Sequence, residues 1–365
     1  MLKQVQHDKG KIIFMIIPVL LILFFGVAVI YSSSPTLAIQ QGTFGILGMA
    51  AYFLLRNFDY RSFIPLLKYF YWIIIILLII TLILGYESRG SVRWIPLGLF
   101  NFQPSEFAKI VVILVLADFW SKHMPTWKNI AKSLGILSPL AILIFRQPDL
   151  GTMLTVVFIW IMMLLASHIS LKKISLLGLA GLIGIPLTWQ ILHDYQKQRI
   201  YSFMSPTADP QGVGFHVIQS MIAVGSGQLF GRGLGRGTQS RLQFLPEFRT
   251  DFIFAFIAEE LGFFGSILVI GLYVAMFYFL YKVLERVGDR FGELIIVGIF
   301  GMLFFQSTVN IGMNIGVLPI TGITLPLLSY GGSSLITTLI CFGIVASIQK
   351  FGMRKKDALI IGKEE

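Results

Sequence analysis

The 365-residue sequence is poor in charge and nearly free of cysteine. Only 13% of its residues are charged, whereas soluble domains carry about a quarter, and 56% are hydrophobic. This composition excludes a disordered chain and almost any water-soluble enzyme. The single cysteine, Cys341, excludes a disulfide-stapled secreted scaffold. The five histidines are scattered and G-x-S-x-G is missing, so the sequence offers neither a metal-ligand cluster nor a serine-hydrolase motif.

Long apolar runs, by contrast, recur from end to end of the sequence. Many reach about 20 residues, enough to cross a bilayer as a helix. The sequence therefore predicts an all-α polytopic membrane protein, a single membrane domain over residues 1–365 with about ten transmembrane helices. The first run is too long for a signal-peptide core, so we interpret it as an uncleaved helix. The predicted spans are 12–30, 36–55, 67–84, 105–119, 130–145, 150–166, 174–192, 252–281, 294–317 and 334–348.

The meaning of the net charge of +11 depends on where the 29 lysines and arginines lie. In a soluble protein such a charge suggests nucleic acid, whereas in a membrane protein it can record orientation. Alternate connections carry 19 of these residues, mostly lysines, and the positive-inside rule places them in the cytoplasm with both termini and the tail 350–365. The outer connections carry eight arginines and one lysine. Arginine suits phosphate and carboxylate groups, so these are candidate anion binders, and chance placement is the alternative.

The longest connection is the predicted extracytoplasmic loop 193–250, between the seventh and eighth predicted helices. Loops of this length are usually functional or carry structure of their own. Its stretch 215–224 is apolar enough to lie on the membrane or dip into it. The glycine-rich run 225–238 lacks the Lys-Ser/Thr ending of a phosphate loop, which favours mobile backbone or a close-packed turn.

Two further outer segments, 88–109 and 318–334, are interrupted by prolines and glycines although they are partly apolar. Irregular backbone at membrane depth persists only when it is buried in protein or lines a wet cavity, so we expect a cavity open to the outer face. Gln306, Asn310 and Asn314 form a stripe at four-residue spacing that must face the bundle interior. Interhelical hydrogen bonding is the default interpretation and substrate contact is the alternative. Glycines at three-residue spacing in 42–48 and 178–184 predict close helix packing.

Ionisable residues within membrane segments are costly and tend to be functional. Glu106 and Lys109 are three residues apart, so they share a helical face and can form a pair. A purely structural ion pair is the alternative to a functional one. Asp149 precedes the sixth predicted span, where a helix N-cap explains it well.

Asp251 lies at the end of the long outer loop, next to an apolar span. An N-cap for that span is one interpretation. The other is a general base, because desolvation and a nearby arginine can tune a carboxylate at the edge of an apolar wall. Glu259 and Glu260 lie about two turns deeper, and at least one is expected to face the interior.

Five sequence motifs resemble those of the SEDS family (shape, elongation, division and sporulation), and they occur in the same order as in the family. The stretch GTQS at 237–240 and the ending GIVASI at 343–348 favour the rod-shape, RodA-type branch over the division branch. One departure is Arg249, where the family often has histidine before Thr-Asp, so a role for that histidine does not transfer. The motifs are QPSEFAK (103–109), QPDLGT (147–152), LPEFRTDFIFA (245–255), EELG (259–262) and SYGGSS (329–334).

The resemblance implies a peptidoglycan glycosyltransferase that polymerises lipid II, an undecaprenyl-pyrophosphate-linked disaccharide pentapeptide, for cell elongation and rod shape. The family's essential acidic residue maps onto Asp251, which would act as general base in an inverting transfer that releases undecaprenyl pyrophosphate. The candidate substrate-binding residues are Arg93, Glu106, Lys109, Arg199, Gln219, Ser240, Glu247 and Thr250. A lipid II flippase and a non-catalytic scaffold are the alternatives.

The resemblance also implies partners and a location. The partners are a class B penicillin-binding protein as transpeptidase, other elongation-complex proteins and membrane lipids, but no nucleic acid. The location is the bacterial cytoplasmic membrane, with the active site on its outer face. The sequence identifies no cofactor, although a divalent cation such as Mg²⁺ is compatible with it.

Overall fold

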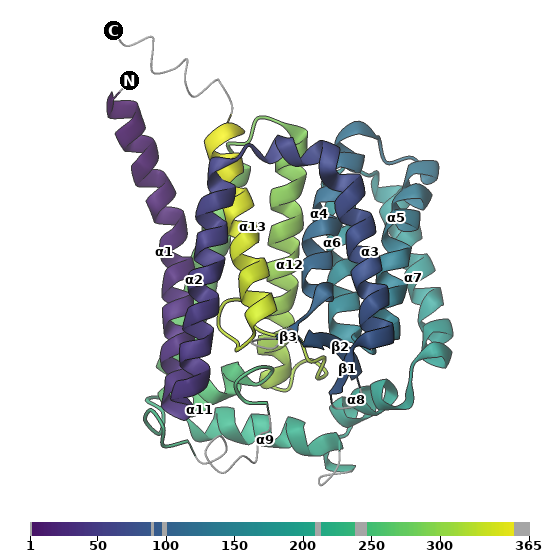
Figure 1. The fold of residues 1–365 in the computed structure, drawn as a ribbon. Helices are drawn as coiled ribbons and strands as arrows, with labels where there is room; N and C mark the ends of the chain where they lie inside the picture. Colours follow the sequence, from purple (N-terminus) through teal and green to yellow (C-terminus); the bar gives the residue numbers. More distant parts are fainter. Residues whose placement is uncertain (1, 89–90, 97–100, 209–212, 238–246, 354–365) are drawn as a thin grey trace.

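The computed structural model describes residues 2–88, 91–96, 101–208, 213–237 and 247–353, most of which form a bundle of long helices (Figure 1). Within this part, eight helical segments are long and apolar enough to cross a membrane, and α6 is a shorter apolar helix. The long helices are α1 (Leu2–Ser33), α2 (Pro35–Asn57), α3 (Leu67–Leu84), α4 (Pro104–Lys122), α5 (Trp127–Arg146), α6 (Leu150–Ala166), α7 (Leu171–Ile191), α11 (Ile253–Leu284), α12 (Arg290–Asn314) and α13 (Gly332–Phe351). The mostly helical membrane fold is therefore confirmed.

Each predicted span coincides with one of these helices. The seventh ends one residue past α7, the eighth begins one residue before α11, and the ninth extends three residues past the end of α12. Several helices begin where a short polar side chain caps free backbone amides. Ser34 accepts from the amide of Leu37 at the start of α2, and Thr126 accepts from that of Asn129 at the start of α5. That all ten helices cross the membrane stays a prediction.

The centre of the bundle is formed by α12 and α13, whose spans are 61% and 72% buried, whereas no residue of the α7 span is buried. The helices α1, α2, α3 and α5 lie around this centre (Figure 1). Gly45 packs on Leu23 and Gly48 on Leu339, as the glycine spacing predicts, but nothing in the described part of the chain lies within 4 Å of the Cβ position of Gly42. The same prediction is wrong for glycines 178, 181 and 184 of α7, because no described atom lies within 4 Å of where their Cβ atoms would be.

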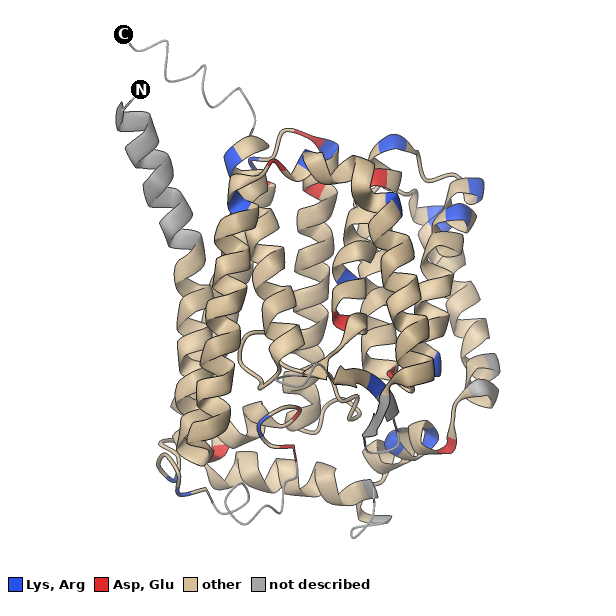
Figure 2. Ribbon diagram, in the orientation of Figure 1, with Lys and Arg blue, Asp and Glu red and all other residues tan. Residues whose placement is uncertain are grey.

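Helix α1 begins and α13 ends at the same end of the bundle (Figure 1). Lysines and arginines gather on the connections at this end (Figure 2), which matches the alternation of basic residues in the sequence. Which end faces the cytoplasm stays a prediction. The opposite end carries the 3₁₀ turn η2 (Pro206–Ala208), α8 (Asp194–Met204) and α9 (Val213–Ser226), which lies across the bundle.

A small antiparallel sheet, which the sequence did not predict, precedes α4 at the same end. Its strands are β1 (Tyr86–Ser88), β2 (Ser91–Pro96) and β3 (Asn101–Phe102), in the order β1-β2-β3. Tyr86 lies opposite Trp94, and Ile95 lies opposite Phe102. The sheet gives the proline-interrupted segment before α4 a regular backbone.

Helix α11 breaks at Gly262, whose backbone has φ 67° and ψ −158°, a conformation that only glycine adopts readily. In an unbroken helix, the amide of Phe263 would bond the carbonyl of Glu259. Instead, Phe263 N donates to Gln228 O at 2.8 Å, and Glu259 O accepts from Arg232 N at 2.9 Å. The glycine-rich run thus satisfies the backbone groups that the break sets free.

The run can approach this closely because glycines, which lack side chains, lie at the points of contact. A Cβ atom on Gly231 would lie 2.1 Å from the carbonyl oxygen of Glu260, and one on Gly262 would lie 2.3 Å from the amide of Gly231. The Glu260 carboxylate is buried and accepts from Ser32 Oγ at 2.8 Å and from Gly235 N at 2.6 Å. The described part of the run, 225–237, is therefore a close-packed turn, one of the two predicted alternatives.

We expect Gly262→Ala to lower the free energy of unfolding by about 1–3 kcal/mol or more, because alanine is strained at this backbone conformation and collides with Gly231. The matched control is Gly271→Ala in the same helix, where nothing lies within 4 Å of the Cβ position. The measurement is the thermal unfolding midpoint of the detergent-solubilised protein. Equal midpoints for the two variants would contradict the close packing at the break.

Candidate active site

Asp251 lies in the turn that leads into α11, but it does not cap that helix. The cap residue of α11 is Phe252, and no side chain caps the first turn. The turn is closed by backbone bonds from Thr250 N at 3.0 Å and Phe252 N at 3.2 Å, both to Glu247 O. The capping interpretation of Asp251 is therefore wrong, and its carboxylate is available for another role.

The backbone of Asp251 is held by two buried asparagines of α12. Asn310 Nδ2 donates to Asp251 O at 2.8 Å and also to Ile323 O at 2.7 Å. Asn314 Nδ2 donates to Asp251 O at 3.0 Å, and its Oδ1 accepts from Ala255 N at 3.0 Å. Two residues of the predicted stripe thus bond backbone outside α12. Asn314 bonds Ala255 of α11, an interhelical bond of the kind that the default interpretation held, and both asparagines fix the Asp251 turn.

The irregular segment 315–331 runs alongside the Asp251 turn and is bonded to it. Ser329 Oγ donates to Thr250 O at 2.6 Å, and Tyr330 N donates to Arg249 O at 2.8 Å. The Ser329 hydroxyl also accepts from Leu325 N at 2.8 Å. These backbone groups of the irregular segment and of the Asp251 turn therefore find their hydrogen-bond partners within the protein.

Arg199 of α8 approaches Asp251 at Gly322. A Cβ atom on Gly322, which has φ 74°, would lie 3.4 Å from Asp251 Oδ2 and 3.7 Å from Arg199 Nη1. Burial raises the pKa of the Asp251 carboxyl, and the cations of Arg199 and Arg93 oppose that rise. Burial lowers the pKa of the Arg199 guanidinium, although it remains charged at any physiological pH.

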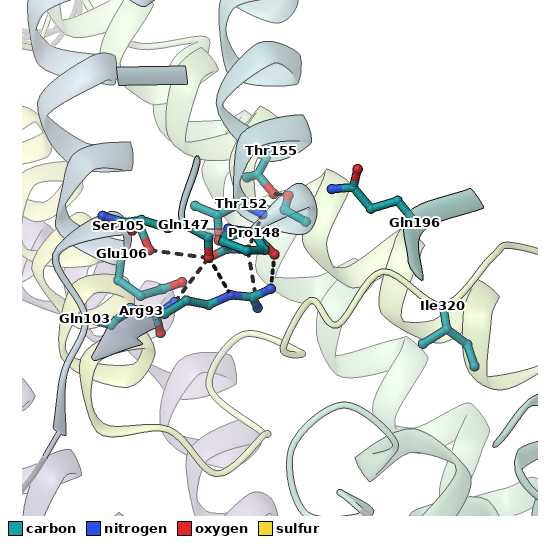
Figure 3. Close-up of polar contacts among 12 residues, drawn as sticks. Arg93, Gln103, Ser105, Glu106, Gln147, Pro148, Thr152, Thr155, Gln196 and Ile320 are labelled. Carbon is teal, nitrogen blue, oxygen red and sulfur yellow. Dashed lines mark hydrogen bonds and ion pairs between the residues drawn. The ribbon is translucent and has the colours of Figure 1, made fainter. Parts of the chain in front are cut away.

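Arg93 projects from β2 onto the turn between α5 and α6 (Figure 3). Its Nε donates to Gln147 O at 3.2 Å, and its Nη2 donates to Pro148 O. Its Nη1 lies 3.8 Å from Asp149 Oδ1. The guanidinium is therefore held by two carbonyls and one carboxylate.

Asp149 is the N-cap of α6, as predicted, because its Oδ1 accepts from Thr152 N at 3.1 Å. Its Oδ2 accepts from Gln103 Nε2 at 3.3 Å and from Ser105 Oγ at 3.4 Å (Figure 3). The motif at 103–109 and the motif at 147–152 are thus in direct contact. Sequence spacing alone does not reveal this contact.

The other predicted site residues lie in three different places. Lys109 Nζ lies 2.8 Å from both carboxylate oxygens of Glu106, and the two side chains form a buried pair in α4 with 1% and 6% exposure. Thr250 Oγ1 donates to Glu247 Oε2 at 2.9 Å within the Asp251 turn. Gln219 lies on α9, which packs on α8 and α11. The prediction for Ser240 falls outside the described residues.

His216, a lone histidine on α9, lies outside the residues that the sequence analysis selected. Its Nδ1 is buried without a hydrogen-bond partner in the described part of the chain, and its ring centroid lies 6.4 Å from that of Phe252. Burial and the nearby Arg199 lower the pKa of the imidazole. His216 is therefore a neutral side chain beside the site. Within the described residues, no cluster of three or more His, Cys, Asp or Glu side chains could hold a metal ion.

The fold and motifs define a membrane-protein family. The family model described as "cell cycle protein", which covers FtsW, RodA and SpoVE, matches residues 6–354. The chain belongs to this family, as the SEDS resemblance predicted.

Two named relatives are similar in sequence over most of their length. Peptidoglycan glycosyltransferase MrdB of Escherichia coli K12 is 39% identical over 340 residues, which cover 92% of each protein. Stage V sporulation protein E of Bacillus subtilis is 37% identical over 360 residues, covering 92% of this chain and 96% of the relative.

Solved structures are similar as well. A chain from a peptidoglycan synthase complex, described as coordinating polymerization and crosslinking, has a TM-score of 0.79 and 32% identity, over 92% of this chain and 96% of that one. The rod shape determining protein RodA of Thermus thermophilus has a TM-score of 0.71 and 28% identity, over 93% of this chain and 97% of that one.

We expect Lys109→Met to destabilise the protein by about 3–5 kcal/mol, because the Glu106 carboxylate would remain buried without its cation. The double variant Glu106→Gln with Lys109→Met should recover much of the loss. The control is Lys282→Met, which breaks an exposed pair with Glu285 and should change the unfolding midpoint little. Comparable midpoint changes in both single variants would contradict the burial argument.

Proposed function

We propose that this chain is a peptidoglycan glycosyltransferase that polymerises lipid II into glycan strands for cell elongation and rod shape. The observation that carries the proposal is the position of Asp251. Its backbone is fixed by Asn310 and Asn314, its carboxylate is not used as a helix cap, and Arg199 approaches it at Gly322. A carboxylate so placed is suited to proton abstraction next to a bound anion.

In the proposed reaction, Asp251 accepts the proton of the acceptor GlcNAc 4-hydroxyl as general base. The hydroxyl oxygen forms a bond to the anomeric carbon of the donor MurNAc with inversion. The bond from that carbon to the pyrophosphate oxygen breaks, and undecaprenyl pyrophosphate leaves with the bonding electron pair. A pKa raised by burial strengthens Asp251 as a base.

Arg199 and Arg93 are the proposed counter-charges for the leaving pyrophosphate. A guanidinium fork matches phosphate oxygens, and a preorganised cation stabilises charge that develops in the transition state. Within the described residues, the hydrogen bond from Arg199 Nη1 to Ile320 O is long, at 3.5 Å, so breaking it to bind an anion would cost little. Arg93 is more firmly held and is better suited to shaping the site.

The relatives support the reaction class, because those named above include a peptidoglycan glycosyltransferase and a chain of a peptidoglycan synthase complex. The proposed partner is a class B penicillin-binding protein, which would crosslink the strands that this chain makes. The proposed location is the bacterial cytoplasmic membrane. Both termini would lie in the cytoplasm, and the end that carries α8 and α9 would lie outside.

We expect Asp251→Asn to lower the rate of polymerisation at least about 10²–10⁴-fold, the usual contribution of a general base. The assay is glycan synthesis from purified lipid II by the detergent-solubilised protein with its transpeptidase partner. The control is Asp194→Asn, which removes an exposed carboxylate from α8 and should leave the rate unchanged.

Full polymerisation by Asp251→Asn would overturn the assignment and favour a scaffold. A proteoliposome assay tests the flippase alternative. Transfer of lipid II across the bilayer by wild-type protein that makes no glycan would replace the enzyme with a transporter.

The polymerisation rate should fall as pH falls through the pKa of Asp251, because a general base must be deprotonated. That pKa is raised by burial and lowered by Arg199. Arg199→Ala removes the opposing cation, so the acidic limb of the rate profile should move to higher pH. Arg199→Lys keeps the charge and should hold the limb nearer its wild-type position. Profiles normalised to each variant's maximum provide the measurement, and an unmoved limb in Arg199→Ala would contradict the proposed electrostatics.

A further inference from the structure

We propose that Tyr195 is a positioning residue that holds Arg199 beside Asp251. The proposal rests on the proposed function, because it assigns Arg199 to the pyrophosphate of the lipid-linked donor. It adds a residue that lies outside all the sequence motifs singled out above. Three contacts of α8 carry the argument.

The first contact docks the start of α8 on the turn between α5 and α6. Tyr195 Oη donates to Pro148 O at 3.0 Å. Gln196 Nε2 donates to Tyr195 Oη at 3.0 Å, while Gln196 Oε1 accepts from His193 N at 3.0 Å and so caps α8. Gln196 is fully buried, so this network fixes the hydroxyl of Tyr195 and the first turn of the helix together.

The second contact joins Tyr195 to Arg199. The two residues are four apart on one helix, so their side chains lie on the same face. Arg199 Cζ lies 5.7 Å from the centroid of the Tyr195 ring, within the range of a cation–π interaction. Since the hydrogen bond from Arg199 to Ile320 O is long, the ring is a second contact that can orient the guanidinium beside Asp251.

The third contact is the shared carbonyl of Pro148. This oxygen accepts from Tyr195 and also from Arg93. The two cations that act on Asp251 are therefore attached to one turn, Arg93 directly and Arg199 through the Tyr195 ring.

The test is a double-mutant cycle on the binding of undecaprenyl pyrophosphate to the full-length protein in detergent. Tyr195→Leu should weaken binding by about 3- to 30-fold, the range expected for a lost cation–π contact. Tyr195→Phe keeps the ring and should lose less. In an Arg199→Ala background, Tyr195→Leu should cause no further loss, because Tyr195 acts only through Arg199.

The matched control is Tyr201→Leu, which removes an exposed tyrosine from the same helix and should bind as wild type does. The proposal would be overturned if the losses of affinity of the two single variants multiplied in the double variant. It would also be overturned if Tyr195→Leu bound the probe as tightly as wild type, or if the wild-type protein did not bind it. If Tyr195→Leu does not fold, the cycle with Tyr195→Phe decides by the same criterion. Wild-type protein that binds the probe and shows the coupling but makes no glycan would refute the proposed function while the positioning role stands.

Discussion

The site depends on one constraint, that irregular backbone inside a helical membrane bundle must have its polar groups satisfied. At the Asp251 turn, the side-chain amides of Asn310 and Asn314 meet this requirement from α12. Because Asn310 also binds Ile323 O, it joins the turn to the segment that carries Gly322. Asp251 is thus positioned by hydrogen bonds to its backbone carbonyl, and its carboxylate oxygens do not cap α11.

Burial and charge act on Asp251 in opposite directions, and the site needs both. Desolvation alone would raise the pKa of the carboxyl and favour its protonated form. The cations alone would lower that pKa and leave a weaker base. The two arginines differ in how they can serve. Arg93 is held by two carbonyls and by Asp149, the residue that also caps α6, so moving it would break several contacts at once. Within the described residues, Arg199 contacts the Tyr195 ring and makes a long hydrogen bond to Ile320 O, so it is held less firmly than Arg93.

Sequence periodicity and chemistry predicted the helices and the inward asparagine stripe, because each depends on residues that are near in sequence, whereas the role of Asp251 came from the family resemblance and stays a prediction. The sequence could not decide whether Asp251 caps α11, since a shift of one residue changes the cap. Nor could it reveal the docking of Tyr195 on Pro148, the approach of Arg199 at Gly322 or the small sheet. These contacts join segments that are distant in sequence. Glycines 178, 181 and 184 show in addition that a local spacing of small residues does not by itself predict a packed helix beside them.

The break at Gly262 bears on the same site. The turn that holds Asp251 continues into the first part of α11, and this part is separated from the rest of the helix at Gly262. Across the break, Glu259 O and Phe263 N bond the glycine-rich run instead of each other. The first part of α11 is therefore bonded to the glycine-rich run, which belongs to the connection between α7 and α11. Since that connection also carries α8, the same segment of chain positions the carboxylate and the arginine that faces it.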